Sequence, residues 1–437
     1  MRRAAQRIVE KLRLHGHEAF FAGGWVRDFL LRRKPKDIDI ATSALPDEIA
    51  RLFPNSKPVG AQFGVILVPL YGHTYEVATF RSDNAYLDGR HPVSVVFSGP
   101  EQDALRRDFT INGLFYDPVA DRLIDYVHGR MDIQKKLIRT IGDPAVRFAE
   151  DKLRMLRAIR LSCSLDFRIV PETWGAMQKN APEILQVSWE RIRDELIRVF
   201  TGPAPGTGLN LLYESGLLTH ILPEVAAMRG IPQSPDSMPE NDIFTHTRAT
   251  LAMLRKPSAV LAFGTLLHDV GKPSTYSADA NSCFERHAQL GGKLSEGICR
   301  RLRMSNEEIT RIVDLVSSHM DFQQASDMRE SSLKRFLRNP HIVDHLELYR
   351  ANCLASQKSL EIYSRCVRKL KEYQQEPEES PLIRGEDLIE MGYAPGPVFK
   401  EILRTVEDLQ LEGALRTRED ALRHIKASFP LPGKTQL

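Results

Sequence analysis

The stretch FAGGWVRDFLLRRKPKDIDI, residues 21–40, decides the fold of this 437-residue chain. It ends in an Asp-x-Asp pair inside a β-rich run. Because strand side chains alternate between two faces, Asp37 and Asp39 should project to one side while Ile38 and Ile40 enter the core. Two carboxylates on one face favour a cation such as Mg2+, which proteins hold with one or two carboxylates and with substrate phosphates.

A glycine pair in the same stretch supplies the second half of a site. Gly23 and Gly24 have no Cβ, so backbone N–H groups can approach a phosphate closely there. A helix that begins at Trp25 would point its positive end at the same place. The stretch therefore predicts that a metal and a triphosphate meet here, although either feature alone also suits an ordinary turn or a charged strand end.

Length and composition limit the class of protein. A chain of 437 residues exceeds one hydrophobic core, so about two to four domains are expected. No apolar run approaches the ~18 residues of a membrane span, and the N-terminus lacks the apolar segment of a secretory signal. The odd number of cysteines without CxxC spacing suits reduced thiols. We expect a cytoplasmic protein with no membrane partner.

The first 80 residues read as a mixed α/β unit. Apolar residues at helical spacing predict a first helix that closes near Gly16, followed by a strand over residues 17–22. Thr42 or Ser43 is expected to cap a helix that runs towards residue 53. Residues 64–70 and 74–80 predict a hairpin, in which Glu76 would offer a third carboxylate to the metal site.

Two later segments carry polar residues suited to nucleotides. Within RRDFTINGLFYDP, residues 106–118, the charged and amide groups could hold a sugar and phosphates, or could be structural. Residues 142–167 predict a turn and one helix, with Asp151 and Arg154 on one face. Such a pair forms a salt bridge or, alternatively, reads cytosine or adenine through the amino group and ring nitrogen.

The rest of the chain is expected to be helical. Residues 188–200 predict a helix capped by Ser188, and the Gly/Pro-rich residues 201–208 predict a connector. An acidic linker is expected over residues 374–381. Four histidines and an aspartate in this half favour a divalent-metal pocket, or else a hydrogen-bond network at helix ends: His246, His268, Asp269, His287 and His319.

Four motifs in order resemble those of one family. GGWVRDFLL with KDIDIAT, RRDFTINGLFYDP, EDKLRMLRAIR and SWERIRDEL are similar to motifs of class II tRNA nucleotidyltransferases and the related bacterial poly(A) polymerases, within the polymerase-β-like superfamily. The resemblance implies an α+β fold with a small mixed-sheet head over residues 1–140 and a helical neck over 141–205. A helical HD-like body over 206–355 and a helical, tRNA-binding tail over 356–437 would follow.

The resemblance also implies an activity. The chain would add or repair the 3′-terminal CCA of tRNA from CTP and ATP without a nucleic-acid template, with the RNA 3′-hydroxyl attacking the α-phosphate and pyrophosphate leaving. The stretch over residues 60–72 and the length of the loop over 81–100 favour CCA addition. Addition of A alone, or of poly(A), by the same machinery is the main alternative.

Residue functions follow from the same resemblance. Asp37 and Asp39 would hold catalytic Mg2+, and Glu76 would be an extra carboxylate. The triphosphate would lie against Gly23, Gly24 and Arg27. The ribose and nucleotide would be aligned by Arg107, Asp108 and Asn112. The base would be selected by Glu150, Asp151 and Arg154.

The second half resembles an HD domain, which in a subset of these enzymes is a metal-dependent phosphohydrolase. His246, His268 and Asp269 match its pattern, while His287 and His319 resemble its additional histidines. A second divalent metal would then lie in this body. Asn352 stands where a late aspartate is normal, and a neutral amide is a weaker metal ligand. The body is therefore expected to be either a phosphohydrolase or a structural remnant that helps to hold RNA.

Overall fold

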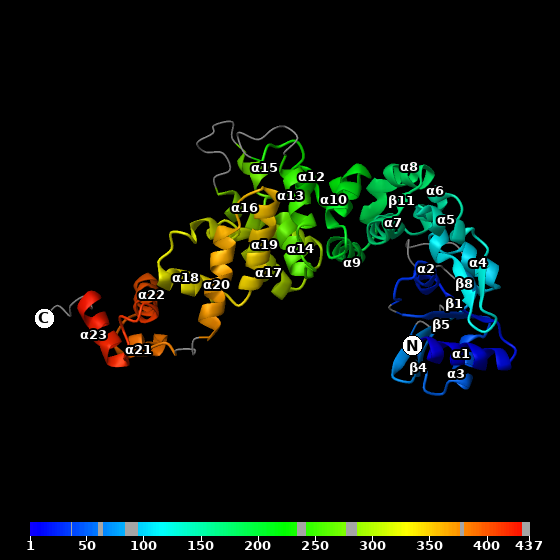
Figure 1. The fold of residues 1–437 in the computed structure, drawn as a ribbon, viewed down its shortest axis with the longest axis horizontal. Coiled ribbons are helices and arrows are strands. Elements are labelled where there is room, and N and C mark those ends of the chain that lie inside the picture. Colours follow the sequence, from blue (N-terminus) through cyan, green and yellow to red (C-terminus); the bar gives the residue numbers. More distant parts are fainter. Residues whose placement is uncertain are drawn as a thin grey trace.

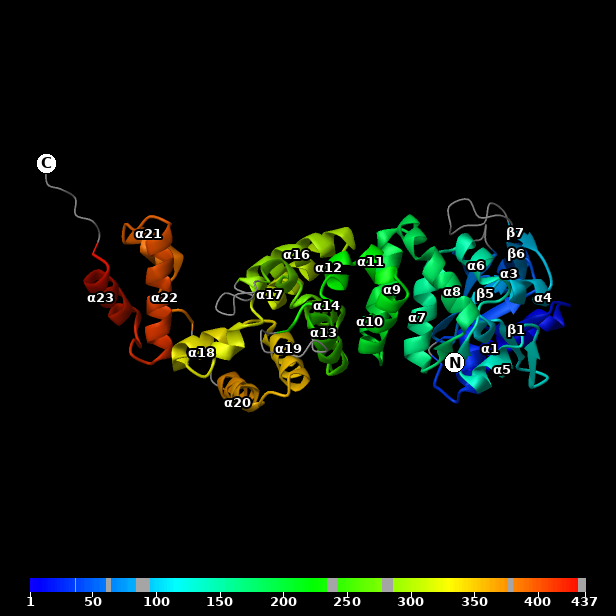
Figure 2. The same cartoon turned by 90° about the horizontal axis from the view of Figure 1, so that it is seen from above.

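The protein is elongated and curved, and its head, neck, body and tail follow one another along its length (Figures 1 and 2). The computed structural model describes residues 1–35, 37–59, 64–83, 95–233, 242–276, 286–375 and 380–430. The N-terminal head lies at one end and helices α21 to α23 lie at the other (Figures 1 and 2). Among the described residues, no helix combines the length and apolar character that a membrane crossing requires.

The head combines a sheet with short helices. Its elements are α1 (Arg2–Leu14), β1 (Ala19–Ala22), α2 (Gly24–Leu30), β2 (Asp39–Thr42), α3 (Pro46–Leu52), β3 (Lys57–Pro58), β4 (Val65–Leu70), β5 (His73–Thr79), β6 (Arg81–Asp83), β7 (Val95–Phe97), α4 (Pro100–Leu105), η2 (Thr110–Asn112), β8 (Leu114–Asp117), β9 (Arg122–Asp125) and α5 (Gly129–Lys135). The predicted first helix, first strand and hairpin are confirmed.

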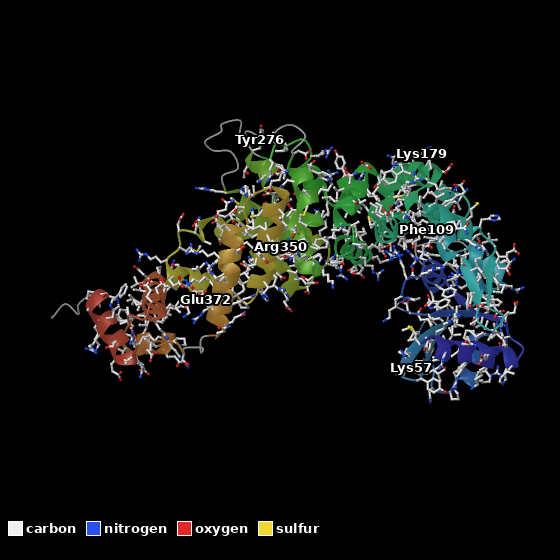
Figure 3. The ribbon with its side chains drawn as sticks, viewed as in Figure 1. Lys57, Phe109, Lys179, Tyr276, Arg350 and Glu372 are labelled. Carbon is white, nitrogen blue, oxygen red and sulfur yellow. The ribbon has the colours of Figure 1, made fainter. Side chains whose placement is uncertain are left out.

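The head sheet is mixed, as the sequence predicts. Its seven strands run in the order β3-β4-β5-β2-β1-β8-β9. β2 and β5 pair in parallel, with Ile40 opposite Val77, whereas β4 and β5 form an antiparallel hairpin. Figure 3 shows Lys57, on edge strand β3, at the outer part of the head, and Phe109 where the head meets the neck.

The neck follows the head and is almost entirely helical. It contains α6 (Pro144–Glu150), α7 (Leu153–Leu165), α8 (Pro171–Asn180), η3 (Ala181–Gln186) and α9 (Trp189–Phe200), with a two-residue strand β11 (Arg168–Ile169) that pairs with β10 (Leu137–Ile138). One face of α9 is apolar and buried, with Ile192, Leu196, Val199 and Phe200. α10 crosses α9 so closely that a Cβ on Gly208 would lie 2.3 Å from Val199 Cγ1.

The body and tail are helical throughout the described residues. They contain α10 (Pro205–Glu214), α11 (Leu217–Ile221), α12 (Pro223–Ala226), α13 (Ile243–Ala252), α14 (Ala259–Leu267), α15 (Lys272–Thr275), α16 (His287–Arg301), α17 (Asn306–Ser317), η4 (Asp321–Gln324), α18 (Glu330–Leu337), α19 (Ile342–Ala355), α20 (Glu361–Gln375), α21 (Gly385–Glu390), α22 (Pro397–Leu411) and α23 (Arg418–Ser428). One apolar core continues from the head into the body, and the tail has its own. The four domain limits stay a prediction.

Three local predictions differ from the structure. α3 begins after Leu45 rather than at a hydroxyl cap, because Thr42 Oγ1 donates to the Glu18 carbonyl and Ser43 Oγ accepts the Glu18 N–H. Ser188 has the expected position before α9, but its side chain makes no capping bond. The connector over residues 201–208 is half helical, since α10 begins at Pro205. Most of the loop over 81–100 and part of the linker over 374–381 lie outside the described residues.

Candidate active site

The three carboxylates predicted in the head come together at adjacent strands. The parallel register that sets Ile40 beside Val77 places Asp39 next to Glu76. β2 begins only at Asp39, so Asp37 lies just before the strand rather than within it. The alternation still holds, because Ile38 and Ile40 are buried while Asp37 is exposed. The carboxylates therefore face one side of the sheet.

Electrostatics of this cluster favour a bound cation. The pKa of Asp39 is raised to about 6, mainly by burial and then by the negative charges of Asp37 and Glu76, against the opposing effect of Arg107. Carboxylates this close repel each other, and a divalent ion between them would relieve that repulsion. Their oxygen donors are the hard ligands that Mg2+ takes. The residues thus fit such an ion.

The glycine turn brings a cation against these carboxylates. Gly23 has φ +66°, a conformation that side chains rarely adopt, and it directly precedes α2. A Cβ there would lie 3.1 Å from Arg107 Nη1 and 3.8 Å from Asp39 Oδ2. The absent side chain therefore leaves room for the guanidinium next to the turn. α2 starts at Gly24, one residue before the predicted start.

One buried carboxylate, which the sequence reasoning missed, holds both arginines of the RRDFTIN segment. Asp103 Oδ1 lies 2.7 Å from Arg106 Nη2, and its Oδ2 lies 2.9 Å from Arg107 Nη2. Burial alone would raise the pKa of Asp103, but the two guanidiniums hold it below its ordinary value. The signal would have been the spacing of Asp103, three and four residues before the two arginines, which makes them neighbours on one face of a helix.

A chain of polar contacts connects the head with the neck. Arg27 Nη1 donates to Asn112 Oδ1 at 2.7 Å, and Asn112 Nδ2 donates to Asp108 Oδ1 at 3.2 Å. Asp108 Oδ2 pairs with Arg157 of α7 at 2.7 Å. Although burial would raise the pKa of Asp108, Arg157 and the Asn112 hydrogen bond keep it below its ordinary value. Arg157 was not among the predicted residues.

The segment predicted to select the base is arranged differently from the prediction. The single helix over residues 142–167 is two helices, and Asp151 lies between them in an extended conformation, φ −147° and ψ 104°. Asp151 and Arg154 are therefore not paired on one helix face. Arg154 instead pairs with Glu150, and its Nη1 donates to the Arg147 carbonyl at 3.0 Å.

Asp151 has two partners of its own. Its Oδ1 accepts the Leu153 backbone N–H at 3.1 Å at the start of α7, the kind of bond that makes Asp common at helix starts. Its Oδ2 lies 2.8 Å from Arg191 Nη2, a residue of α9 that the sequence reasoning did not single out. Each half of the segment is thus held by an opposite charge, Arg154 by Glu150 and Asp151 by Arg191.

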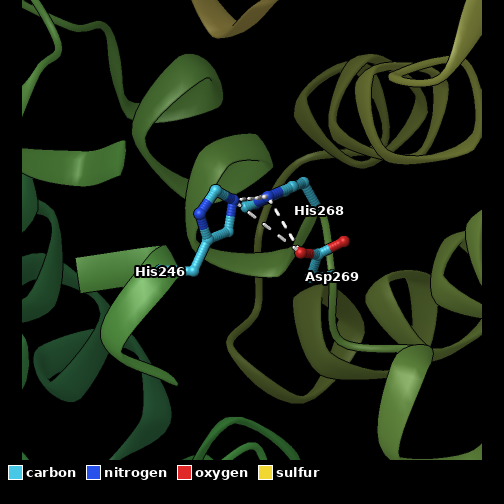
Figure 4. A group of neighbouring side chains, drawn as sticks. All are labelled: His246, His268 and Asp269. Carbon is cyan, nitrogen blue, oxygen red and sulfur yellow. Dashed lines mark hydrogen bonds and ion pairs between the residues drawn. The ribbon is translucent and has the colours of Figure 1, made fainter. Parts of the chain in front are cut away.

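The five residues predicted for the body pocket also converge. His246 lies on α13 and His268 at the end of α14, with Asp269 directly after it (Figure 4). His287 begins α16 and His319 follows α17. All five side chains are buried, and they form two groups of potential metal ligands that share Asp269.

Two imidazoles of the pocket, those of His246 and His319, are neutral at pH 7. Burial, together with the charge of His268, lowers the pKa of His246 and of His319 to about 3. Burial alone would raise the pKa of Asp269, but His268 and Lys272 hold it well below its ordinary range. Neutral imidazole beside ionised carboxylate is the ligand set of many divalent-metal sites, so the residues fit such an ion.

Backbone hydrogen bonds fix two rings of this pocket, and one further prediction concerns Asn352. His268 Nδ1 and His319 Nδ1 each lie 2.7 Å from a backbone carbonyl, those of Thr265 and Val316, which fixes both rings. Asn352 lies on α19, where its Oδ1 accepts from Ser356 Oγ at 3.4 Å. That Asn352 takes the place of a metal-binding aspartate stays a prediction.

Three family models match successive parts of the chain. Residues 19–139 match the poly(A) polymerase head domain, and residues 166–229 match a model described as "Probable RNA and SrmB-binding site of polymerase A". Residues 283–425 match domain 2 of a tRNA nucleotidyltransferase. The matches thus cover most of the head, the later part of the neck and most of the body and tail, and they leave out residues 140–165 and 230–282.

Relatives are similar over about half of the chain. The CCA-adding enzyme of Geobacillus thermodenitrificans is 45% identical over 215 residues, which is 49% of this chain and 53% of that protein. That of Bacillus licheniformis is 44% identical over 211 residues, 48% of this chain and 53% of that protein. The matched part spans about half the length of these relatives.

Solved structures are similar over nearly the whole chain. The Bacillus stearothermophilus CCA-adding enzyme in complex with CTP has a TM-score of 0.74 and 26% identity, with 98% of each chain covered. The Thermotoga maritima CCA-adding enzyme complexed with tRNA has a TM-score of 0.61 at 21% identity, covering 97% of this chain and 94% of that one, and shares the fold.

Proposed function

Because the chain belongs to the family of class II tRNA nucleotidyltransferases and bacterial poly(A) polymerases, we propose that it adds or repairs the 3′-terminal CCA of tRNA, using CTP and ATP. The RNA 3′-hydroxyl attacks the α-phosphate of the nucleotide and pyrophosphate leaves. The observation that carries this proposal is the cluster of Asp37, Asp39 and Glu76 beside the Gly23 turn, with Arg107 next to it.

The carboxylates supply the metal ligands. Divalent metals serve nucleotidyltransferases of this kind, and we propose Mg2+ on Asp37 and Asp39 from their hard oxygen donors. When bound, such ions lower the pKa of the attacking hydroxyl and neutralise charge on the leaving group. Glu76 adds negative charge next to Asp39, so the site holds a cation more strongly than two carboxylates alone would.

The arginines orient the substrate. Arg107, held through its Nε and Nη2 by Asp103, presents its Nη1 edge beside Gly23, where a triphosphate oxygen would meet it. Arg27 and Asp108 meet at Asn112, so the groups proposed to align the nucleotide are already ordered. α2 has only seven residues, so we assign phosphate binding to these side chains and the turn rather than to a helix dipole.

Base selection follows from hydrogen-bond complementarity. Cytosine and adenine both present an amino donor next to a ring-nitrogen acceptor, whereas uracil and guanine present the reverse pattern. Asp151 would accept from the amino group and Arg154 would donate to the ring nitrogen. Glu150 and Arg191 hold these two side chains in place. The same pair can therefore accept CTP and ATP while excluding UTP and GTP.

The proposed partner is the acceptor arm and 3′ end of tRNA. The helical tail would grip the arm through phosphate contacts, so binding should weaken as salt rises. A cytoplasmic location would match this substrate.

The test is nucleotide incorporation with Mg2+ on three tRNA transcripts, which end before CCA, after C and after CC. Each is offered CTP, ATP or both. Extension of the first transcript by CCA, followed by a stop, supports the proposal. A single A added only to the CC-ended tRNA would replace it with A addition, and long A tails on any RNA would indicate a poly(A) polymerase.

A second function is favoured by the body pocket. We propose that His246, His268, Asp269, His287 and His319 hold a divalent metal, because their ligand atoms gather within 4.8 Å in two buried groups. Such a site suits a phosphohydrolase. Hydrolysis of p-nitrophenyl phosphate with Mn2+, lost in His268→Gln but kept in Asp39→Asn, would support that activity. Binding of metal without hydrolysis would leave the pocket with a structural function.

A further inference from the structure

The C-terminal end of the neck helix α7 is bonded to an arginine of the head. A helix leaves its last carbonyls without partners inside the helix. Arg33, which follows α2, donates from Nη1 to the Ser164 carbonyl at 2.7 Å and from Nη2 to the Leu165 carbonyl at 3.4 Å. A guanidinium in this place also interacts favourably with the negative end of the helix dipole. The contact therefore joins head and neck across more than 130 positions of sequence.

The end of α2 fixes the point from which Arg33 reaches α7. Arg32 has φ +54°, a left-handed conformation that is more usual for glycine. Its N–H bonds to the Phe29 carbonyl at 3.0 Å, and the N–H of Arg33 bonds to the Asp28 carbonyl at 2.9 Å. This pair of bonds is the Schellman pattern, which closes a helix with one left-handed residue. Arg33 thus extends from a defined turn.

A second contact holds α7 to the head nearer the start of the helix. Arg157 pairs with Asp108 at 2.7 Å. Asp108 accepts from Asn112, which in turn accepts from Arg27 of α2. Ser164 comes seven residues after Arg157, which is about 10 Å along a helix. A rod attached at one point can turn about it, whereas two attachment points fix its direction. The two contacts therefore fix the direction of α7 relative to α2.

The direction of α7 matters because the proposed nucleotide site spans head and neck. The triphosphate would lie against the Gly23 turn and Arg107 in the head, whereas Asp151 and Arg154, at the start of α7, would select the base. Within the described residues, α7 packs mainly against α9 and α10, which do not belong to the head. A displacement of about 1 Å between groups that must act together can lower a rate by about 10²-fold.

We propose that Arg33 is a positioning residue for base selection, because its bonds to the end of α7 hold the base-selecting pair at the correct distance from the triphosphate site. The inference rests on the nucleotidyltransferase function proposed above. Without Arg33, the base contacts of CTP and ATP weaken, whereas the triphosphate contacts, which all four nucleotides share, remain. Arg33 is exposed, so its replacement leaves the apolar core intact.

The test is equilibrium binding of the four nucleotides to the full chain with Mg2+ and without tRNA. Arg33→Met removes the charge and the donors, so the Kd for CTP and ATP should rise about tenfold while the Kd for UTP and GTP changes little. The matched control Arg32→Met removes the same charge from the adjacent exposed residue and should keep the wild-type preference. Arg33→Lys, whose ammonium can reach one of the two carbonyls, should have an intermediate preference.

Several outcomes would overturn the inference. An unchanged preference in Arg33→Met, together with a raised KM for tRNA, would assign Arg33 to a tRNA phosphate instead. Equal weakening of all four nucleotides, or the same loss in Arg32→Met, would show that Arg33 does not act on base selection. Thermal unfolding shows whether each variant is folded; if Arg33→Met is not, a wild-type preference in Arg33→Lys contradicts the inference. A wild type without preference would overturn the proposed base selection itself.

Discussion

Asp39 in the head and Asp269 in the body are both candidate metal ligands, yet their surroundings are opposite. Asp39 lies near two other carboxylates and one guanidinium, and its pKa is raised to about 6. Asp269 lies among imidazoles and an ammonium, and its pKa is held well below its ordinary range. Without a bound cation, negative charge dominates the head site. The body site, in contrast, contains the positive charge of Lys272 next to Asp269.

The two sites also differ in how the chain builds them. Asp39 and Glu76 lie on the neighbouring strands β2 and β5, Asp37 lies just before β2, and all three remain partly open to solvent. The body residues come from four helices and are buried. An open cluster of oxygens suits a hard ion that arrives with a triphosphate, whereas a buried imidazole cluster suits an ion that stays bound.

The largest effect should come from removing the charge of Asp269. In Asp269→Asn the ammonium of Lys272 loses its carboxylate partner, and an uncompensated buried charge costs about 3–5 kcal/mol. Because the pKa of Asp269 is depressed in the fold, this stability is present at neutral pH and is lost as pH falls through that pKa. Urea unfolding at pH 7 measures it. The exposed control Asp327→Asn should change stability by less than about 0.5 kcal/mol.

A smaller effect is expected from Arg191, which positions Asp151. Arg191→Met removes a charged hydrogen bond worth about 1.5–3 kcal/mol, so the preference for CTP and ATP over UTP and GTP should fall about 10- to 100-fold. Ratios of kcat/KM for the four nucleotides measure this. Arg191→Lys should restore part of the preference. Equal loss of rate with all four nucleotides and an unchanged preference would mean that Arg191 is only structural.

The pH dependence of the head should follow Asp39. Protons compete with the metal below pH 6, so the Mg2+ concentration for half-maximal incorporation should rise about tenfold per pH unit there and level off above pH 7. Glu76→Gln removes a negative charge that raises the pKa of Asp39, so it should move the midpoint of the pH profile to lower pH. A profile that stays flat down to pH 5, or a midpoint that moves upward in Glu76→Gln, would show that Asp39 does not control metal binding.

The smallest effect is the change in folding stability expected from Asp39→Asn, and its sign is opposite to that expected from Asp269→Asn. The folded pKa of Asp39 exceeds its ordinary value of 3.8, so the fold loses stability as pH rises from about 4 through 6. Asp39→Asn should therefore stabilise the metal-free head at pH 7 by about 1 kcal/mol, after allowance for solvent screening. Thermal unfolding in EDTA measures it, with the exposed Asp47→Asn as control. Destabilisation by Asp39→Asn would contradict the proposed difference between Asp39 and Asp269.

Local patterns in the sequence predict the head carboxylates better than the contacts between residues far apart in the sequence. Strand alternation is enough to place Asp37, Asp39 and Glu76 on one side, because strand geometry fixes side-chain direction. Arg157 and Arg191 contact Asp108 and Asp151 across large sequence separations, which no local periodicity encodes. The break at Asp151 was missed because the apolar spacing continues across it.

In the body pocket, too, the sequence predicts which residues belong together but not how they contact one another. Residue types suffice to identify His246, His268, Asp269, His287 and His319 as one group, since few other arrangements satisfy so many buried polar side chains. Which oxygen of Asp269 faces which histidine depends on how α13, α14, α16 and α17 pack. That packing is a tertiary property, so the position of Lys272 on the Oδ2 side could be read only from the structure.

The assignment of nucleotide transfer to the head is tested most directly by incorporation of CTP and ATP into a tRNA that lacks CCA, by the wild type, Asp39→Asn and His268→Gln. We expect the wild type and His268→Gln to complete CCA at similar rates, while Asp39→Asn loses activity by at least ~10³-fold. Incorporation that survives in Asp39→Asn, or that disappears in a folded His268→Gln, would contradict the assignment of nucleotide transfer to the head.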